Sequence, residues 1–300
     1  MPLVLKQKRL PGRVASASAC AEFAAVVCER EPGWSLHLLA WPVGGSDAVL
    51  ARGRSGLPSV SCGEEGQVAL LLGDALLVFP PRCKEPTVRR LGCAPESAHW
   101  INGFAEADSL AVFFRAADAD GVVLASANSA RSLRLGDPGE VRLFAASTEG
   151  AVGALLGPPY KLEVVLRGRA AQVPLRSAAG HALGLALSSK IAVVGRTGRG
   201  GVVEVYSLAA RACLAVRLVH GGLPLSVSVA GASSLASCSD GTGGGGVFGF
   251  SLSGGHFPLA GGHWPMVQLT PRGAVLARRN QIAMSCERDC PWFGGVRLPR

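Results

Sequence analysis

The histidines and cysteines are the residues of this sequence best suited to catalysis or metal binding, and their spacing favours neither. The six histidines share no common interval, and the nine cysteines are scattered and odd in number. A disulfide framework requires an even count at paired spacings. We therefore expect free thiols that are buried in the core or lie on the surface.

One metal site has the right ligand types but lacks the right spacing. Cys286 and Cys290 follow His256 and His263, and zinc accepts thiolate and imidazole ligands. The spacing C-x3-C is not typical of a zinc site, and nothing in the sequence places either histidine beside the cysteines. We expect no metal and no cofactor.

Catalytic motifs are absent from the sequence. There is no G-x-S-x-G elbow for a serine nucleophile and no H-E-x-x-H pair for a metalloprotease. The adjacent carboxylates Glu64 and Glu65 lie between Gly63 and Gly66, which is typical of a solvated turn. These observations predict a protein that is not an enzyme.

A glycine-rich stretch, Gly195-Arg-Thr-Gly-Arg-Gly-Gly, resembles a phosphate-binding loop at first sight. It lacks the closing Gly-Lys-Ser/Thr, and a strand pattern rather than a helix pattern follows it. Without a helix N-terminus the backbone amides do not converge on a phosphate. The stretch is better interpreted as a β-turn with exposed arginines.

The composition is that of a folded protein with a basic surface. Hydrophobic residues make up 48% of the chain, charged residues 17%, and the formal net charge is +9. The excess comes from arginines dispersed over many turns, with no stripe of alternating basic and aromatic residues. The charge therefore indicates a solvated surface, and we expect no nucleic-acid partner.

No apolar run approaches the roughly 18 residues that cross a bilayer. At the N-terminus, the charges of Lys6, Lys8 and Arg9 come after the short apolar piece, which is the reverse of a signal peptide. We expect a cytoplasmic protein without a transmembrane segment.

Short β-prone runs, each closed by a turn rich in Gly or Asp, recur along the whole chain. One example is Val68–Leu72, followed by Gly73-Asp74 and then by Ala75–Phe79. A period of about 40 residues with four short strands per unit indicates a propeller. The closing strands of successive units end near Ala40, Phe79, Leu124, Leu166, Tyr206 and Phe250.

We therefore predict an all-β, seven-bladed, WD40-like β-propeller that occupies residues 1–300 as a single domain. The least regular region is 125–160, which is expected to hold an elaborated blade or a loop. The Gly-Trp-Asp signatures of common WD repeats are missing.

Residues from about 182 to 252 resemble the two signature blades of the PROPPINs, WD-repeat propellers that bind phosphoinositides in autophagy and at endosomes. The segments that carry the resemblance are Leu185–Leu208, Arg217–Gly222, Pro224–Val229, Ser233–Asp240 and Val247–Leu252. Weaker similarity covers Trp34–Ala51 and Ser59–Pro81, in the same blade order.

The resemblance implies a phosphoinositide site, with several replacements. The two adjacent arginines of the family fall on Val219 and His220, and two supporting positions fall on Gly201 and Glu204, where the carboxylate would repel phosphate. The residues that remain for such a site are His220, Gly221, Thr197, Arg199, Ser239 and Asp240.

The predicted propeller and its resemblance to the PROPPINs lead to two hypotheses for the function. The first is a PROPPIN-like adaptor in autophagy or endosomal traffic, which binds protein partners and is peripheral on those membranes, with phosphoinositide binding weakened or lost. The second is a divergent WD40-type scaffold that binds proteins and has no lipid site.

Overall fold

The computed structural model describes residues 5–285 with gaps. The gaps are at 41–46, 92–94, 102–108, 116–118, 126–129, 158, 167–168, 177–179, 198–199, 220–221, 232, 243, 252–255 and 271–272. Within these ranges every regular element is a β-strand. No helix there is long and apolar enough to cross a membrane.

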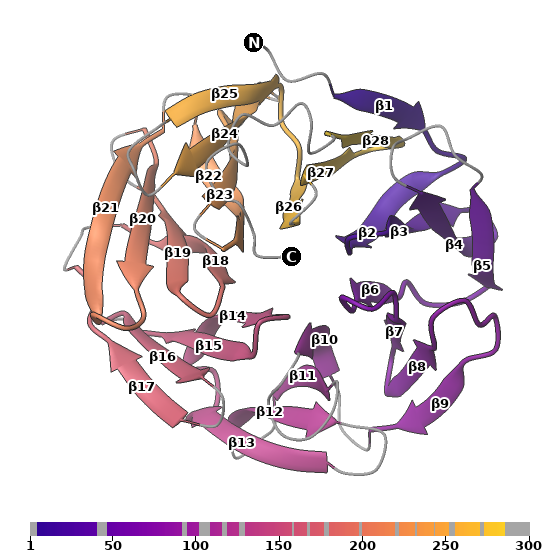
Figure 1. The fold of residues 1–300 in the computed structure, drawn as a ribbon, viewed down its shortest axis with the longest axis horizontal. Coiled ribbons are helices and arrows are strands. Elements are labelled where there is room, and N and C mark those ends of the chain that lie inside the picture. Colours follow the sequence, from indigo (N-terminus) through magenta and orange to yellow (C-terminus); the bar gives the residue numbers. More distant parts are fainter. Residues whose placement is uncertain are drawn as a thin grey trace, which may run out of the picture.

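The strands form seven antiparallel sheets of four, arranged as blades around a central axis (Figure 1). Each blade is named here by its order in the chain, and its strands run from the axis outward.

The first four blades follow one another without interruption. Blade 1 consists of β2 (Arg13–Ala19), β3 (Phe23–Arg30), β4 (Gly33–Ala40) and β5 (Ala48–Gly53). Blade 2 consists of β6 (Ser59–Cys62), β7 (Val68–Leu72), β8 (Ala75–Phe79) and β9 (Thr87–Arg90). Blade 3 consists of β10 (Pro95–Ile101), β11 (Ser109–Arg115), β12 (Asp120–Ala125) and β13 (Ala130–Gly136). Blade 4 consists of β14 (Val141–Ser147), β15 (Ala151–Leu156), β16 (Lys161–Leu166) and β17 (Arg169–Val173).

The remaining three blades complete the ring. Blade 5 consists of β18 (Ala182–Leu187), β19 (Ile191–Arg196), β20 (Val202–Ser207) and β21 (Ala212–Leu218). Blade 6 consists of β22 (Leu223–Ala230), β23 (Ser233–Ser239), β24 (Gly245–Ser251) and β25 (His256–Gly261). Blade 7 consists of β26 (Met266–Thr270), β27 (Gly273–Arg278), β28 (Gln281–Met284) and β1 (Lys6–Arg9).

The seven-bladed all-β fold predicted from the sequence is thus confirmed. The strands expected to end each repeat unit are the third strands of blades 1 to 6, and an outermost fourth strand follows each of them. The region 125–160 contains β13, the outermost strand of blade 3, together with β14 and β15 of blade 4.

The turn between β7 and β8 shows how local sequence sets the register. Leu72 pairs with Ala75, which leaves Gly73 and Asp74 as the two turn residues. Gly73 has a φ of 58°, a conformation that glycine adopts without steric cost. The turn fixes the pairing of β7, which is almost wholly buried, with the partly buried β8.

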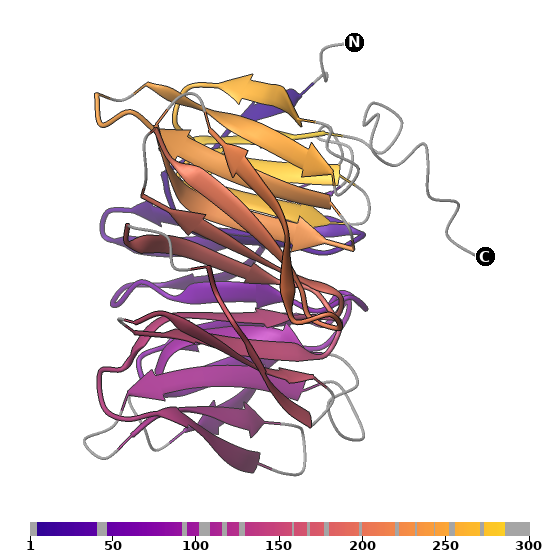
Figure 2. The same ribbon diagram turned by 90° about the vertical axis from the view of Figure 1, so that its left-hand side faces the viewer.

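The hydrophobic core lies between neighbouring blades, which pack face to face (Figure 2). Between blades 5 and 6, for example, Val193 and Val203 pack with Ala236 and Phe250. Because the second strand of a blade has neighbours on both faces, all six residues of β19 are buried. Strands of this kind appear in the sequence as nearly continuous apolar runs.

Side-chain hydrogen bonds join the innermost strands of adjacent blades. Ser18 Oγ of blade 1 accepts a bond from Cys62 N of blade 2, at 3.0 Å, and Ser228 Oγ of blade 6 accepts one from Leu269 N of blade 7, at 2.8 Å. Each hydroxyl accepts a hydrogen bond from a backbone N–H of the next blade, which would otherwise lack a partner in its own sheet.

The ring is closed in two places. At the outer rim, β1 pairs antiparallel with β28, so that Lys6 lies opposite Met284 and the last blade contains both ends of the fold (Figure 1). Near the axis, Gln268 Oε1 accepts a bond from Ala19 N at 2.8 Å, and Gln268 Nε2 donates to Ala19 O at 3.1 Å. Blades 7 and 1 are therefore joined both at the outer rim and near the central axis.

Candidate functional site

The main candidate site is a cavity of about 710 Å³ at the centre of the ring. Its described lining comes mainly from the innermost strands of six blades, β2, β6, β14, β18, β22 and β26, and from turns that follow them, with Ser233 of β23 and Val275 and Ala277 of β27. A cavity of this size is in the usual range for a binding site for a small molecule or a few side chains.

The walls of the cavity carry apolar side chains, with larger ones such as Phe144 and Met266 among the small ones, and hydroxyl side chains. Ala17, Ala145 and Ala186 represent the first kind, and Ser147 and Thr148 the second. Of the described residues that line the cavity, two carry a charge, Glu64 and Glu149, and both are acidic.

Glu149 is held in place by its neighbours. Its Oε2 accepts hydrogen bonds from the backbone N of Ser189, at 3.0 Å, and from the Ser189 hydroxyl. Its own backbone N donates to Ser147 Oγ at 3.0 Å. These bonds connect blades 4 and 5 and fix a carboxylate at the mouth of the cavity.

The residues predicted for a phosphoinositide site are only partly described. His220, Gly221 and Arg199 lie outside the described residues. Thr197 is engaged in the turn after β19, where its Oγ1 accepts a bond from His181 N at 2.6 Å and its N donates to His181 O at 2.8 Å.

Ser239 ends β23, and Asp240 begins the turn that follows it. Ser239 Oγ accepts a bond from Gly241 N at 3.3 Å. Asp240 Oδ1 accepts bonds from Thr242 N and Thr242 Oγ1, both at 2.8 Å, and from Gly244 N at 3.0 Å. The bond from Thr242 N, with the others, lowers the pKa of the exposed Asp240 carboxyl. This residue is therefore an anion that organises its own turn.

Glu204 was expected to repel phosphate from a binding surface, and that expectation is wrong. Its side chain is buried, and Oε2 lies 2.8 Å from Arg196 Nε in an ion pair within blade 5. The Tyr206 hydroxyl donates to the same Oε2 at 2.7 Å. Burial, followed by this bond, raises the pKa of Tyr206 well above its usual range.

The interpretation of 195–201 as a turn with exposed arginines is wrong for Arg196, which ends β19 and is 1% exposed. The sequence did contain a signal for its ion pair. Arg196 and Glu204 are opposite charges in two otherwise apolar runs that form one hairpin. Val219, at the position of one family arginine, is also a core residue, because it is 1% exposed and packs in the cluster between blades 5 and 6.

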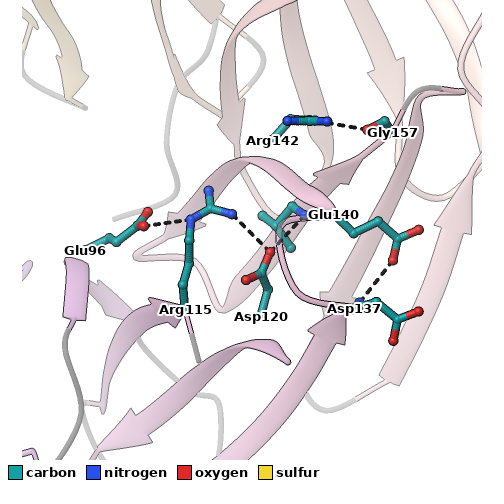
Figure 3. Close-up of polar contacts among 8 residues, drawn as sticks. Glu96, Arg115, Asp120, Asp137, Glu140, Arg142 and Gly157 are labelled. Atoms are coloured by element: carbon teal, nitrogen blue, oxygen red, sulfur yellow. Dashed lines mark hydrogen bonds and ion pairs between the residues drawn. The ribbon is translucent and has the colours of Figure 1, made fainter. Parts of the chain in front are cut away.

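A second polar cluster lies where blades 3 and 4 meet (Figure 3). The buried Asp120 accepts bonds through Oδ2 from Arg115 Nη1, at 3.0 Å, and from Val141 N, at 3.1 Å. Arg115 also bonds Glu96 at 2.6 Å. Asp120 thus connects the third strand of one blade to the first strand of the next, which is a structural role.

The thiol predictions can be checked in part. Six cysteines are free in the described ranges, whereas Cys286 and Cys290 of the considered zinc site lie outside them. Burial raises the pKa of the Cys28 thiol to about 11 and that of Cys238 to about 12. No group of three potential metal ligands occurs among the described residues.

Comparison with known proteins places the chain by fold. No family model matches the sequence, and no curated protein matches it. A chain of the mitotic checkpoint complex is similar in structure, with a TM-score of 0.69 and 14% identity over 94% of this chain and 90% of that one. The WD40 propeller domain of Doa1 has a TM-score of 0.62 and 12% identity over 94% and 95%.

A third similar structure belongs to an enzyme. It is a catalytically inactive virginiamycin B lyase from Staphylococcus aureus, with a TM-score of 0.69 and 7% identity over 95% of this chain and 99% of that one. At such identities the likeness concerns the fold. The chain is a WD40-like seven-bladed propeller, and this fold is shared by a lyase and by WD40 domains.

Proposed function

We propose that this chain is a protein-interaction scaffold that contacts its partners at the mouth of the central cavity. The observation that carries the proposal is the cavity of about 710 Å³, to which the innermost strands of six blades contribute. The described part of its rim consists of short turns between the strands of a closed ring, which is the usual arrangement of a binding surface. We expect the scaffold to have no catalytic role.

The test is to obstruct the cavity without disturbing the sheets. Ala21 lines the cavity from the turn after β2, and it is partly exposed. The variant Ala21→Trp places a large side chain there. Ala209→Trp is the matched control, because Ala209 is exposed in the turn between β20 and β21, next to the outermost strand of blade 5.

The readout is quantitative co-purification of the two variants and the wild type from the native cell. We expect a defined set of proteins that is lost with Ala21→Trp and retained with Ala209→Trp, while both variants unfold at the wild-type temperature. Retention of the whole set by Ala21→Trp would overturn the central site. A wild type that retains no protein would overturn the scaffold itself.

We also propose the narrower PROPPIN-like role, in which the scaffold acts at autophagic or endosomal membranes from the cytoplasm. Its support is the resemblance of residues 182–252 to the PROPPIN signature blades, together with two exposed leucines near Val219 and His220, the positions of the two family arginines. Leu218 is 58% exposed and Leu223 is 37% exposed, on either side of residues 220–221. Exposed apolar side chains on a basic protein suit a membrane surface.

Liposome pelleting separates the two roles. If the narrower role holds, vesicles with phosphoinositides pellet the protein at low salt, vesicles without them do not, and higher salt weakens the binding. His220→Arg should then strengthen pelleting, because arginine is charged at every working pH. Equal pelleting by both kinds of vesicle, or none, would leave only the scaffold.

A further inference from the structure

The described residues of the turns around the mouth of the central cavity are mainly acidic where they are charged, although the chain as a whole is basic. These turns connect the first and second strands of each blade. Their described residues include four glutamates and one lysine, whereas the chain has a formal net charge of +9. The charged residues in question are Glu22, Glu64, Glu65, Glu149 and Lys190.

The acidic groups lie on both sides of the cavity. On one side, the Glu22 carboxylate of blade 1 reaches the turn of blade 2, where its Oε2 would be 3.7 Å from a Cβ on Gly66. Glu64, in that same turn, lines the cavity. On the other side, Glu149 of blade 4 lines it as well. Several carboxylates around one opening concentrate a negative potential there.

The interior of the cavity suits a side chain that is apolar along its length and charged at its end. Its wall presents apolar side chains and hydroxyls, and no arginine or lysine is among the described residues that line it. Lysine and arginine carry three or four methylenes below a cationic head. Glu149, already held by Ser189, would meet such a head with little loss of side-chain freedom.

We infer that the central cavity receives a lysine or arginine side chain from an extended basic segment of a partner protein. This inference rests on the proposed function and names the chemistry of its partner. The same charges disfavour an anionic occupant, so a phosphate-bearing ligand is not expected in this cavity.

The first experiment selects ligands without bias. A random heptapeptide library displayed on phage is selected on the immobilised full chain, and in parallel on Ala21→Trp and on the double variant Glu64→Gln, Glu149→Gln. We expect the wild type to enrich peptides with lysine or arginine at a fixed position, and neither variant to enrich them. Enrichment of acidic or purely apolar peptides, or of none, would overturn the inference.

The second experiment measures affinity. The most enriched peptide, labelled with fluorescein, is titrated by anisotropy against each variant and against Glu85→Gln, a control that neutralises an exposed carboxylate between β8 and β9. We expect at least a tenfold weaker affinity for the double variant, a weaker affinity at high salt, and no change for the control. Equal affinity for the double variant and the wild type would overturn the inference.

The outcomes also distinguish this inference from the scaffold proposal. If the co-purified proteins are lost with Ala21→Trp but retained by the double glutamine variant, the scaffold proposal stands and the cationic ligand is wrong. If Ala21→Trp retains every partner, the scaffold proposal fails first. Circular dichroism of each variant verifies that the propeller is folded.

Discussion

Arg196 and Glu204 form an ion pair inside blade 5, with Nε and Oε2 2.8 Å apart and both side chains almost completely buried. The pair is not isolated. Tyr206 donates to the same carboxylate, and the Arg196 guanidinium carbon lies 5.1 Å from the centre of the Tyr160 ring. Two charges removed from water in this way depend on each other, so that loss of one should cost more than loss of both.

The first prediction tests this dependence. Glu204→Gln leaves the charge of Arg196 buried without a counter-charge, and we expect the free energy of unfolding to fall by about 3–5 kcal/mol. The double variant Arg196→Met, Glu204→Gln should be more stable than the single one, because no buried charge remains. Urea unfolding measures both. A loss below about 1 kcal/mol in the single variant, comparable to an exposed pair, would contradict the burial of the pair.

The second prediction concerns the junction of blades 7 and 1. Gln268→Ala removes the two side-chain hydrogen bonds to the backbone N–H and C=O of Ala19. We expect the free energy of unfolding to fall by about 1–3 kcal/mol, because these two backbone groups lose their partners. Gln172→Ala, at an exposed position of the outermost strand β17, should change it by less than about 0.5 kcal/mol. Equal losses in the two variants would show that the junction is not specially sensitive.

The third prediction concerns the position of the family arginine. Val219→Arg places a charge in the core between blades 5 and 6, and we expect the free energy of unfolding to fall by about 3–5 kcal/mol. Because the position is buried, the new arginine should not strengthen phosphoinositide-dependent pelleting above that of the wild type. A stable Val219→Arg protein that pellets more strongly than the wild type with phosphoinositide vesicles would show that the position is exposed.

The fourth prediction concerns thiol reactivity. A raised pKa leaves little thiolate at pH 8, so Cys28 and Cys238 should resist iodoacetamide in the native state and react only after unfolding in urea. Cys83 is exposed and should react at once. Peptide mass spectrometry resolves the three sites. Labelling of Cys28 as rapid as that of Cys83 would mean that the sheet opens locally.

The number of blades could be predicted because the inner strands carry a strong local signal. Pairs such as β7–β8 and β19–β20 are buried between neighbouring blades and appear as apolar runs around a short turn. The exposed outermost strands have no such pattern. The pairing of β1 with β28 joins the two ends of the fold, and the hairpin signals that gave the blade count cannot reveal so distant a contact.

The candidate site was harder to predict, because it too depends on contacts between residues far apart in the sequence. The resemblance places Glu204 at a phosphate-binding surface, but a third strand packed on both faces buries it between Val203 and Val205. The central cavity depends on six strands that are far apart in the sequence. Glu64 and Glu65 lie in a turn, as the sequence predicts, yet only the ring places Glu64 and Glu149 around one cavity.

The pairing of β1 with β28 also sets an order of events during translation. Lys6 leaves the ribosome long before its partner Met284 is made. At about 5–20 residues per second, β1 must wait many seconds as an unpaired strand. Its sequence, Lys-Gln-Lys-Arg, carries three positive charges, which oppose pairing with other nascent chains until the seventh blade emerges.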